Sequence, residues 1–229
     1  MQPKNFTDEP KTGTAIWAAL DLVSLFPSLS FHRHSEGTLT LLGSVTSEQR
    51  GGLEWTLPHL KTLLEKTGLR LPQVTRWLLP EGPGSFTGLR IGAATVKGLL
   101  VVNPCPVTVI SSLEARVLSH PQDAVAVYRV GQDQFAAGFY SDKKWQAVVV
   151  AEKEIPALAA GRPILVDGYT ARLATLALPH SVMCELSASQ LAPALLKSQT
   201  AKTLTTPEEW MAFQPSYWGD TRFGAPPTI

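Results

Sequence analysis

A glycine-rich segment carries the clearest chemical signal in the sequence. Residues 82–92 read GPGSFTGLRIG and directly follow an apolar run. Ser85 or Thr87 can cap a helix that begins there, and the stacked backbone N–H groups of such a helix start suit an anion. Three glycines allow backbone conformations or close approaches that a Cβ would prevent: Gly82, Gly84 and Gly88. The segment therefore predicts a tight strand-to-helix turn, which is either a phosphate cradle or a close-packed corner.

The segment does not match the common catalytic motifs. A Walker A loop needs Lys and then Ser or Thr after its last glycine, whereas Gly88 is followed by Leu89 and Arg90. Gly84-Ser85 does not form a G-x-S-x-G nucleophile elbow. No complete set of acid, base and nucleophile can be named elsewhere in the sequence. We therefore predict no catalytic residues.

Histidines and cysteines give no convincing metal site. His32 and His34 lie two apart on an expected strand and would share one face, but a partly exposed strand face explains them more simply. The sequence contains no His-x-x-x-His pair. Cys105 and Cys184 are too few and too far apart for a metal knuckle or a disulfide framework. The expectation is no metal and two buried thiols in a reducing compartment.

The glycine-rich segment, together with the following AATVKGL at 93–99, resembles the signature of the TsaB family of tRNA threonylcarbamoyladenosine biosynthesis subunits. Weaker similarities are LEWTLP at 53–58, SSLEA at 111–115, Asp167-Gly168, and Pro215-Ser216-Tyr217. The resemblance implies the α/β fold of the actin, Hsp70 and acetate-kinase superfamily, built from two ribonuclease-H-like halves.

The chain departs from the family pattern at several positions. Where the family has IDTST, residues 20–24 read LDLVS, so Asp21 is kept while Leu22 and Val23 replace hydroxyl side chains. Gly52 stands at the family's HSE and Tyr128 at its DAR. These differences indicate a divergent member. Five residues are then remnants of the superfamily's nucleotide site: Asp21, Gly82, Gly84, Asp167 and Gly168.

The resemblance implies a non-catalytic scaffold that binds and stabilises a TsaD-like transferase. The implied partners are that transferase, a TsaE-like ATPase and a second copy of the chain in a homodimer, with tRNA held only indirectly. No cofactor is expected, although ATP or ADP at an interface shared within the complex stays open. The alternatives are an M22-type metallopeptidase or a sugar or acetate-type kinase of the same superfamily. The missing metal pair and the altered first phosphate turn count against both.

The expected partner surface combines a helix at 53–67 with a helix at 87–101. On the second helix Gly88, Gly92 and Thr95 form a stripe of small residues, which we expect to face outward and admit another helix closely. The opposite stripe, which includes Leu89 and Ala93, would then pack on the sheet. The full expected interface is Leu53, Glu54, Leu57, Ser85, Phe86, Thr87, Gly88, Arg90, Ile91, Gly92 and Thr95.

The order of elements agrees with two α/β halves. Strands are expected at 14–22, 28–34 and 38–45, before the helix at 53–67 with its leucine stripe, a strand at 76–79 and the helix after the glycine turn. Pro104 and Pro106 suggest a boundary, with one half at 1–104 and the other at 105–229. The second half shows strands at 124–130, 134–140 and 145–150, followed by alternating helices and strands up to residue 198.

Composition and charge limit the function classes. The chain has 229 residues, 44% of them hydrophobic, and a formal net charge of +1. A protein that holds tRNA by itself should show a dense basic face, because phosphate neutralisation dominates such affinity. No apolar run is long enough for a transmembrane helix, and the polar first 13 residues do not resemble a signal peptide. We therefore expect a cytoplasmic protein without membrane contact.

Overall fold

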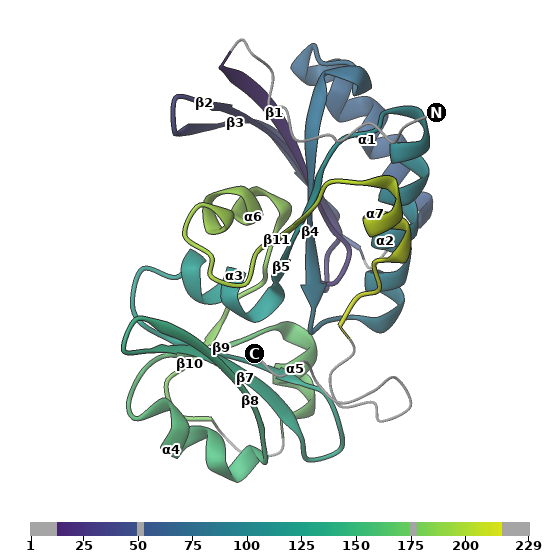
Figure 1. Ribbon diagram of the computed structural model, residues 1–229. Coiled ribbons are helices and arrows are strands. Elements are labelled where there is room, and N and C mark those ends of the chain that lie inside the picture. The colour runs from purple at the N-terminus through teal and green to yellow at the C-terminus, as the bar shows by residue number, and fades with distance from the viewer. Residues whose placement is uncertain (1–12, 50–52, 175–177, 217–229) are drawn as a thin grey trace.

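A computed structural model describes residues 13–49, 53–174 and 178–216. Two β-sheets of different size dominate it, and Figure 1 shows them as an upper and a lower lobe. The larger sheet has the order β11-β5-β4-β1-β2-β3. Its strands are β1 (Thr14–Asp21), β2 (Ser28–Ser35), β3 (Thr38–Thr46), β4 (Val74–Gly82), β5 (Val107–Ser111) and β11 (Lys202–Leu204).

The smaller sheet repeats the topology of the larger one. Its order is β10-β9-β6-β7-β8, with strands β6 (Val125–Arg129), β7 (Phe135–Ser141), β8 (Lys144–Val150), β9 (Ile164–Val166) and β10 (Ser181–Met183). In each sheet three strands form an antiparallel meander, and two later strands add in parallel beside the first strand of that meander. This arrangement is the pair of ribonuclease-H-like halves that the sequence predicts.

Helices cover both faces of the larger sheet. On one face lie α1 (Leu53–Thr67), α2 (Phe86–Val102) and α7 (Pro207–Ala212), which contribute Leu60, Val96 and Trp210 to one core cluster. On the other face lie α3 (Ser112–Ser119) and α6 (Ala188–Leu195), packed on Trp17 and Ala19 of β1. Alternation along β1 explains this division, because successive side chains of a strand point to opposite faces. The remaining helices are α4 (Ile155–Ala159) and α5 (Gly168–Leu173), with short 3₁₀ turns η1 (Leu71–Gln73) and η2 (Glu152–Glu154).

Helix α3 connects the two lobes. Ala115 packs in the core of the larger sheet, whereas Leu113 and Val117 pack against Ala126 and Leu165 of the smaller sheet. The run Ser112–Val117 is buried throughout, as a helix that contacts two sheets requires. The SSLEA sequence is therefore an interlobe packing element.

Strand pairing also bears on the expected division of the chain. β5 follows Pro104 and Pro106 yet pairs with β4, and β11 pairs with β5. The chain therefore passes to the smaller sheet only after α3 and returns to the larger one with α6 and β11. The division at 104/105 into two domains stays a prediction. β11 and α7 lie beyond the last element that was predicted from the sequence.

Candidate functional site: partner surface and remnant phosphate turns

The outer sides of α1 and α2 supply the exposed part of the expected partner surface. Leu57 is 49% exposed and Phe86 40% exposed, which is high for large apolar side chains. The Arg90 guanidinium lies 5.4 Å from the centroid of the Phe86 ring, within the range of a cation–π contact. Glu54, Ser85, Thr87 and Arg90 are also exposed, and Ile91 is partly buried. The side chain of Leu53 lies outside the described part of the chain.

The stripe of small residues does not face outward, so that expectation is wrong. Gly88, Gly92 and Thr95 are buried, as are Leu89 and Ala93 of the opposite stripe. The loop that joins β1 to β2 lies against this stripe, because a Cβ on Gly88 would lie 1.8 Å from the carbonyl oxygen of Leu22 and a Cβ on Gly92 would lie 4.0 Å from Cβ of Leu22. Close packing within this chain therefore explains the small residues, and Gly88, Gly92 and Thr95 leave the candidate partner surface.

The glycine-rich turn has the predicted strand-to-helix form. β4 ends at Gly82, which has φ +113° and precedes a cis peptide bond to Pro83. Ser85 is the N-cap of α2, and its Oγ accepts the N–H of Gly88 at 3.2 Å. A helix N-terminus has unpaired N–H groups that a short hydroxyl side chain satisfies well. The predicted strand-to-helix turn and its Ser85 cap are thus confirmed.

Asp21 lies at the carboxyl end of β1 and is fully buried. Its Oδ1 accepts the N–H groups of Val23 at 2.8 Å and Ser24 at 3.2 Å. Burial raises its pKa from an ordinary value of 3.8 to about 6, although the two N–H groups and nearby Arg116 favour the charged form. The hydrogen bonds of this side chain thus fix the loop that follows β1. Burial, however, makes the ionised form of the carboxylate unfavourable.

Asp21→Asn should be more stable than the wild type, and this difference in the free energy of unfolding should grow as the pH rises. Because the folded-state pKa lies above the unfolded value, the wild type loses stability as pH rises from about 4 through about 6, by about 3 kcal/mol in total. Asn cannot ionise and keeps an oxygen for the Val23 and Ser24 N–H groups. Urea unfolding of both proteins at several pH values checks this. An advantage of Asp21→Asn that does not grow between about pH 4 and pH 8 would contradict it.

The second turn that was expected to be a remnant, Asp167-Gly168, lies at the start of α5. Asp167 is its N-cap and accepts the N–H of Thr170 at 2.8 Å. The other carboxylate oxygen of Asp167 accepts a 3.1 Å hydrogen bond from Nη2 of Arg116, and both side chains are buried. The N–H of Gly168 donates to Oε1 of Glu185 at 2.6 Å. Asp167 and Gly168 are therefore engaged with groups of this chain.

The C-terminal segment crosses α2, a contact that was not predicted from the sequence. Lys97 of the glycine-signature helix donates from Nζ to the carbonyl oxygens of Met211 and Phe213, both at 2.9 Å, so it caps the end of α7. The N–H of Ser216 donates to the carbonyl oxygen of Glu81 at 2.9 Å. The sequence did hold a signal for α7, because Thr206 with Glu209 three residues later forms a capping box.

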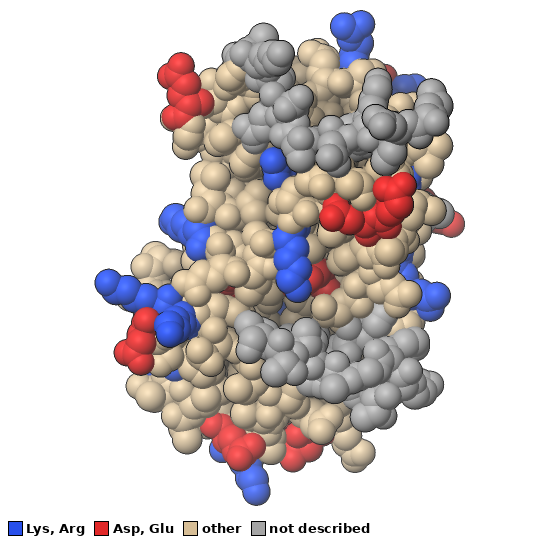
Figure 2. All heavy atoms as spheres, viewed as in Figure 1, with Lys and Arg blue, Asp and Glu red and all other residues tan. Residues whose placement is uncertain are grey.

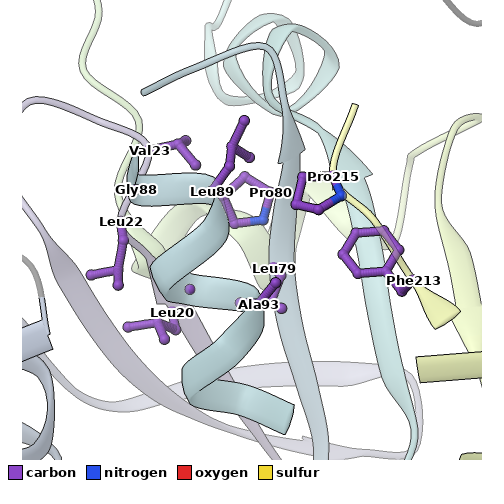
Figure 3. A pocket seen from close by; sticks show the side chains of 11 residues that line it. Leu20, Leu22, Val23, Leu79, Pro80, Gly88, Leu89, Ala93, Phe213 and Pro215 are labelled. Atoms are coloured by element: carbon purple, nitrogen blue, oxygen red, sulfur yellow. The ribbon is translucent and has the colours of Figure 1, made fainter. Parts of the chain in front are cut away.

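A small apolar pocket lies where these parts meet. Figure 3 shows side chains from the ends of β1 and β4, from α2 and from Phe213 and Pro215 around it. No charged side chain lines the pocket. Apolar walls of this kind do not suit a phosphate group.

The histidines do not come together as ligands. His32 is buried, and its Nε2 lies 3.0 Å from Oγ of Ser30, while the ring of His34 stacks on Trp17. Burial lowers the pKa of His32 to about 4. In the described part of the chain no three His, Cys, Asp or Glu side chains are placed to hold a metal ion. Cys105 is buried and Cys184 partly buried.

No helix within the described ranges has the length and apolar character needed to span a membrane.

Comparison with known proteins identifies relatives. Residues 42–152 match the family model of TsaD, tRNA N6-adenosine threonylcarbamoyltransferase. Over 67 residues the chain is 42% identical to the tRNA threonylcarbamoyladenosine biosynthesis protein TsaB of Haemophilus influenzae, a stretch that covers 29% of this chain and 28% of that protein. The chain is thus similar to TsaB over part of its length, and it spans less than a third of that protein.

Solved structures agree with the fold. YeaZ from Pseudomonas aeruginosa aligns with a TM-score of 0.61 at 18% identity, over 79% of this chain and 90% of that one. An uncharacterised protein with similarity to the peptidase YeaZ from Pseudomonas aeruginosa aligns with a TM-score of 0.64 at 18% identity, over 89% of this chain and 99% of that one. The predicted α/β fold with two ribonuclease-H-like halves is confirmed.

Proposed function

We propose that this TsaB-like chain is a non-catalytic subunit that supports the formation of threonylcarbamoyladenosine in tRNA by binding a TsaD-like transferase. The similarity to TsaB supports a role in threonylcarbamoyladenosine formation. The observation that supports a binding role is the exposed pair Phe86 and Arg90, on a helix whose other sides are packed within the chain. Phe and Arg with exposed area on a rigid helix are typical anchors of protein interfaces.

The charge distribution supports an indirect contact with tRNA. Figure 2 shows that Lys and Arg lie scattered among Asp and Glu on the visible face, without an extended basic patch. The net charge of +1 agrees with this. Tight binding of RNA requires many neutralised phosphates. In our proposal the transferase holds the tRNA, a TsaE-like ATPase joins the complex in the cytoplasm, and a homodimer of this chain uses the same helices.

The double variant Phe86→Ala, Arg90→Glu should bind the transferase about 10- to 100-fold more weakly, because it removes an apolar anchor and reverses a charge. Both side chains are exposed, so the fold should be unaffected. Isothermal titration with the purified transferase from the same source measures the change. Arg172→Glu, at an exposed position of α5 in the other lobe, is the matched control and should bind as the wild type does.

The two partners of this surface can be told apart. If the double variant loses self-association in light scattering but keeps its affinity for the transferase, the surface serves the homodimer alone. If both associations match the wild type, the partner surface lies elsewhere. No observation on the described residues favours the kinase or metallopeptidase alternatives.

A further inference from the structure

One loop lies against Gly84 and Gly88 of the first expected phosphate turn and against Gly168 of the second. In the first turn, a Cβ on Gly88 would lie 1.8 Å from the carbonyl oxygen of Leu22, and a Cβ on Gly84 would lie 2.6 Å from Cβ of Val23. In the second turn, a Cβ on Gly168 would lie 3.1 Å from Cδ2 of Leu25. Residues 22–25, which we call the plug, follow Asp21 directly. The glycines thus provide room for this chain's own backbone and apolar side chains.

Several N–H groups of the two turns are also paired within the chain. The N–H of Ser85 donates to the carbonyl oxygen of Val23 at 3.1 Å, and the N–H of Gly88 donates to Oγ of Ser85. At the second turn the N–H of Gly168 donates to the Glu185 carboxylate. A phosphate would have to displace these acceptors before it could reach the N–H groups. Oxygen atoms of this chain therefore accept the N–H groups that would otherwise be free to bind the phosphates of a nucleotide.

A buried ion pair adds a second link between the lobes. Arg116 belongs to α3, which packs on both sheets, and it pairs with Asp167 of the smaller lobe at 3.1 Å. The Arg116 guanidinium also lies 5.8 Å from the ring centroid of Tyr128. Breaking a buried pair leaves an uncompensated charge, which is strongly unfavourable. Opening the lobes to admit a ligand would carry that cost.

We propose that the plug occupies both phosphate turns and holds the two lobes together without a nucleotide, so that ATP and ADP are not ligands of this chain's own cleft. The residues do not fit such a ligand, because Leu22, Val23 and Leu25 present apolar groups and a carbonyl oxygen where phosphates would lie. Asp21 holds the plug in place through the N–H groups of Val23 and Ser24. The signature glycines then have an internal structural role.

Two measurements on the full wild-type chain test the proposal. Titration with ATP or ADP, each with and without Mg²⁺, should show no binding tighter than about 1 mM, which corresponds to only about 4 kcal/mol. Hydrogen exchange of the ligand-free protein should show slow exchange at the N–H groups of Ser85 and Gly168, because both are hydrogen-bonded. Tighter nucleotide binding, or exchange at Ser85 and Gly168 as fast as in an open loop, would overturn the proposal.

A matched pair of variants tests whether the Leu25 side chain protects the N–H groups of the second turn from exchange. Leu25→Ala should speed exchange at Gly168 and Thr170 about tenfold or more, because it removes the side chain that covers the second turn. Leu158→Ala removes a similarly half-buried leucine of α4, which packs on the core of the smaller lobe, and should leave those two N–H groups unchanged. Equal exchange at Gly168 in Leu25→Ala and the wild type would show that the plug does not hold this turn.

Discussion

Gly88→Ala should strongly destabilise the protein, whereas Gly92→Ala, one turn later on the same helix, should stabilise it. A Cβ on Gly88 would lie 1.8 Å from a backbone oxygen and 2.7 Å from the carbonyl carbon of Leu22, so backbone must shift. We expect a loss of about 3 kcal/mol. A Cβ on Gly92 meets only Cβ of Leu22 at 4.0 Å, an ordinary contact. Replacing a helical glycine there should gain about 1 kcal/mol from helix propensity.

Urea unfolding with equal m-values for all three proteins would measure both effects. Gly92→Ala is the internal control, because it adds the same methyl group to the same helix. If Gly88→Ala were as stable as the wild type, the Leu22 carbonyl could not lie against the first turn of α2, and the plug would lose its main contact. If Gly92→Ala were destabilised, the space beside Leu22 would be smaller than the 4.0 Å contact indicates.

Local signals in the sequence predicted the elements well. The alternation in residues 14–46 predicted β1, β2 and β3, and the glycine turn with Ser85 predicted the start of α2. These features depend on neighbours within a few residues, so their physical cause is contained in the local sequence. The leucine stripe of α1 did not show which leucines are buried: Leu57, an expected interface residue, is 49% exposed, whereas Leu60 and Leu63 are buried.

Long-range partners explain what the sequence could not show. The small stripe of α2 was expected to face outward because a helical pattern does not say which distant segment covers each side. Its cover, Leu22, lies more than sixty residues earlier in the chain. Arg116 likewise pairs with Asp167, and Lys97 caps α7, through contacts that only the fold creates. For the partner surface, sequence spacing selected the helices, and exposure then separates Phe86 and Arg90 from the buried glycines.

Glu114 is the residue whose loss should have the other large effect. Its carboxylate is buried and accepts hydrogen bonds from the hydroxyls of Tyr140, Ser198 and Thr200 and from the N–H groups of Gln199 and Thr200. It thereby fixes the segment between α6 and β11 on the interlobe helix α3. Glu114→Ala would remove the shared acceptor of these donors, most of which are partly buried. We expect a loss on the order of 4 kcal/mol in the free energy of unfolding, measured by urea unfolding near neutral pH.

The pH dependence of the unfolding free energy of a second variant separates the contribution of the Glu114 charge from that of its size and shape. The hydroxyl and N–H donors hold the pKa of Glu114 below its ordinary value although burial opposes this. The wild type therefore has stabilisation that is complete above the unfolded pKa of about 4.3 and is lost as the pH falls through the folded value. Glu114→Gln keeps the size but cannot ionise, so its deficit should shrink on acidification. The rising contribution of Asp21 at low pH is common to both proteins and cancels in this difference.

Glu65→Gln, at an exposed position of α1, is the control and should change stability by less than about 0.5 kcal/mol at every pH. If the deficit of Glu114→Gln were independent of pH, the donors would recognise the size and shape of this side chain, and its negative charge would add no stability.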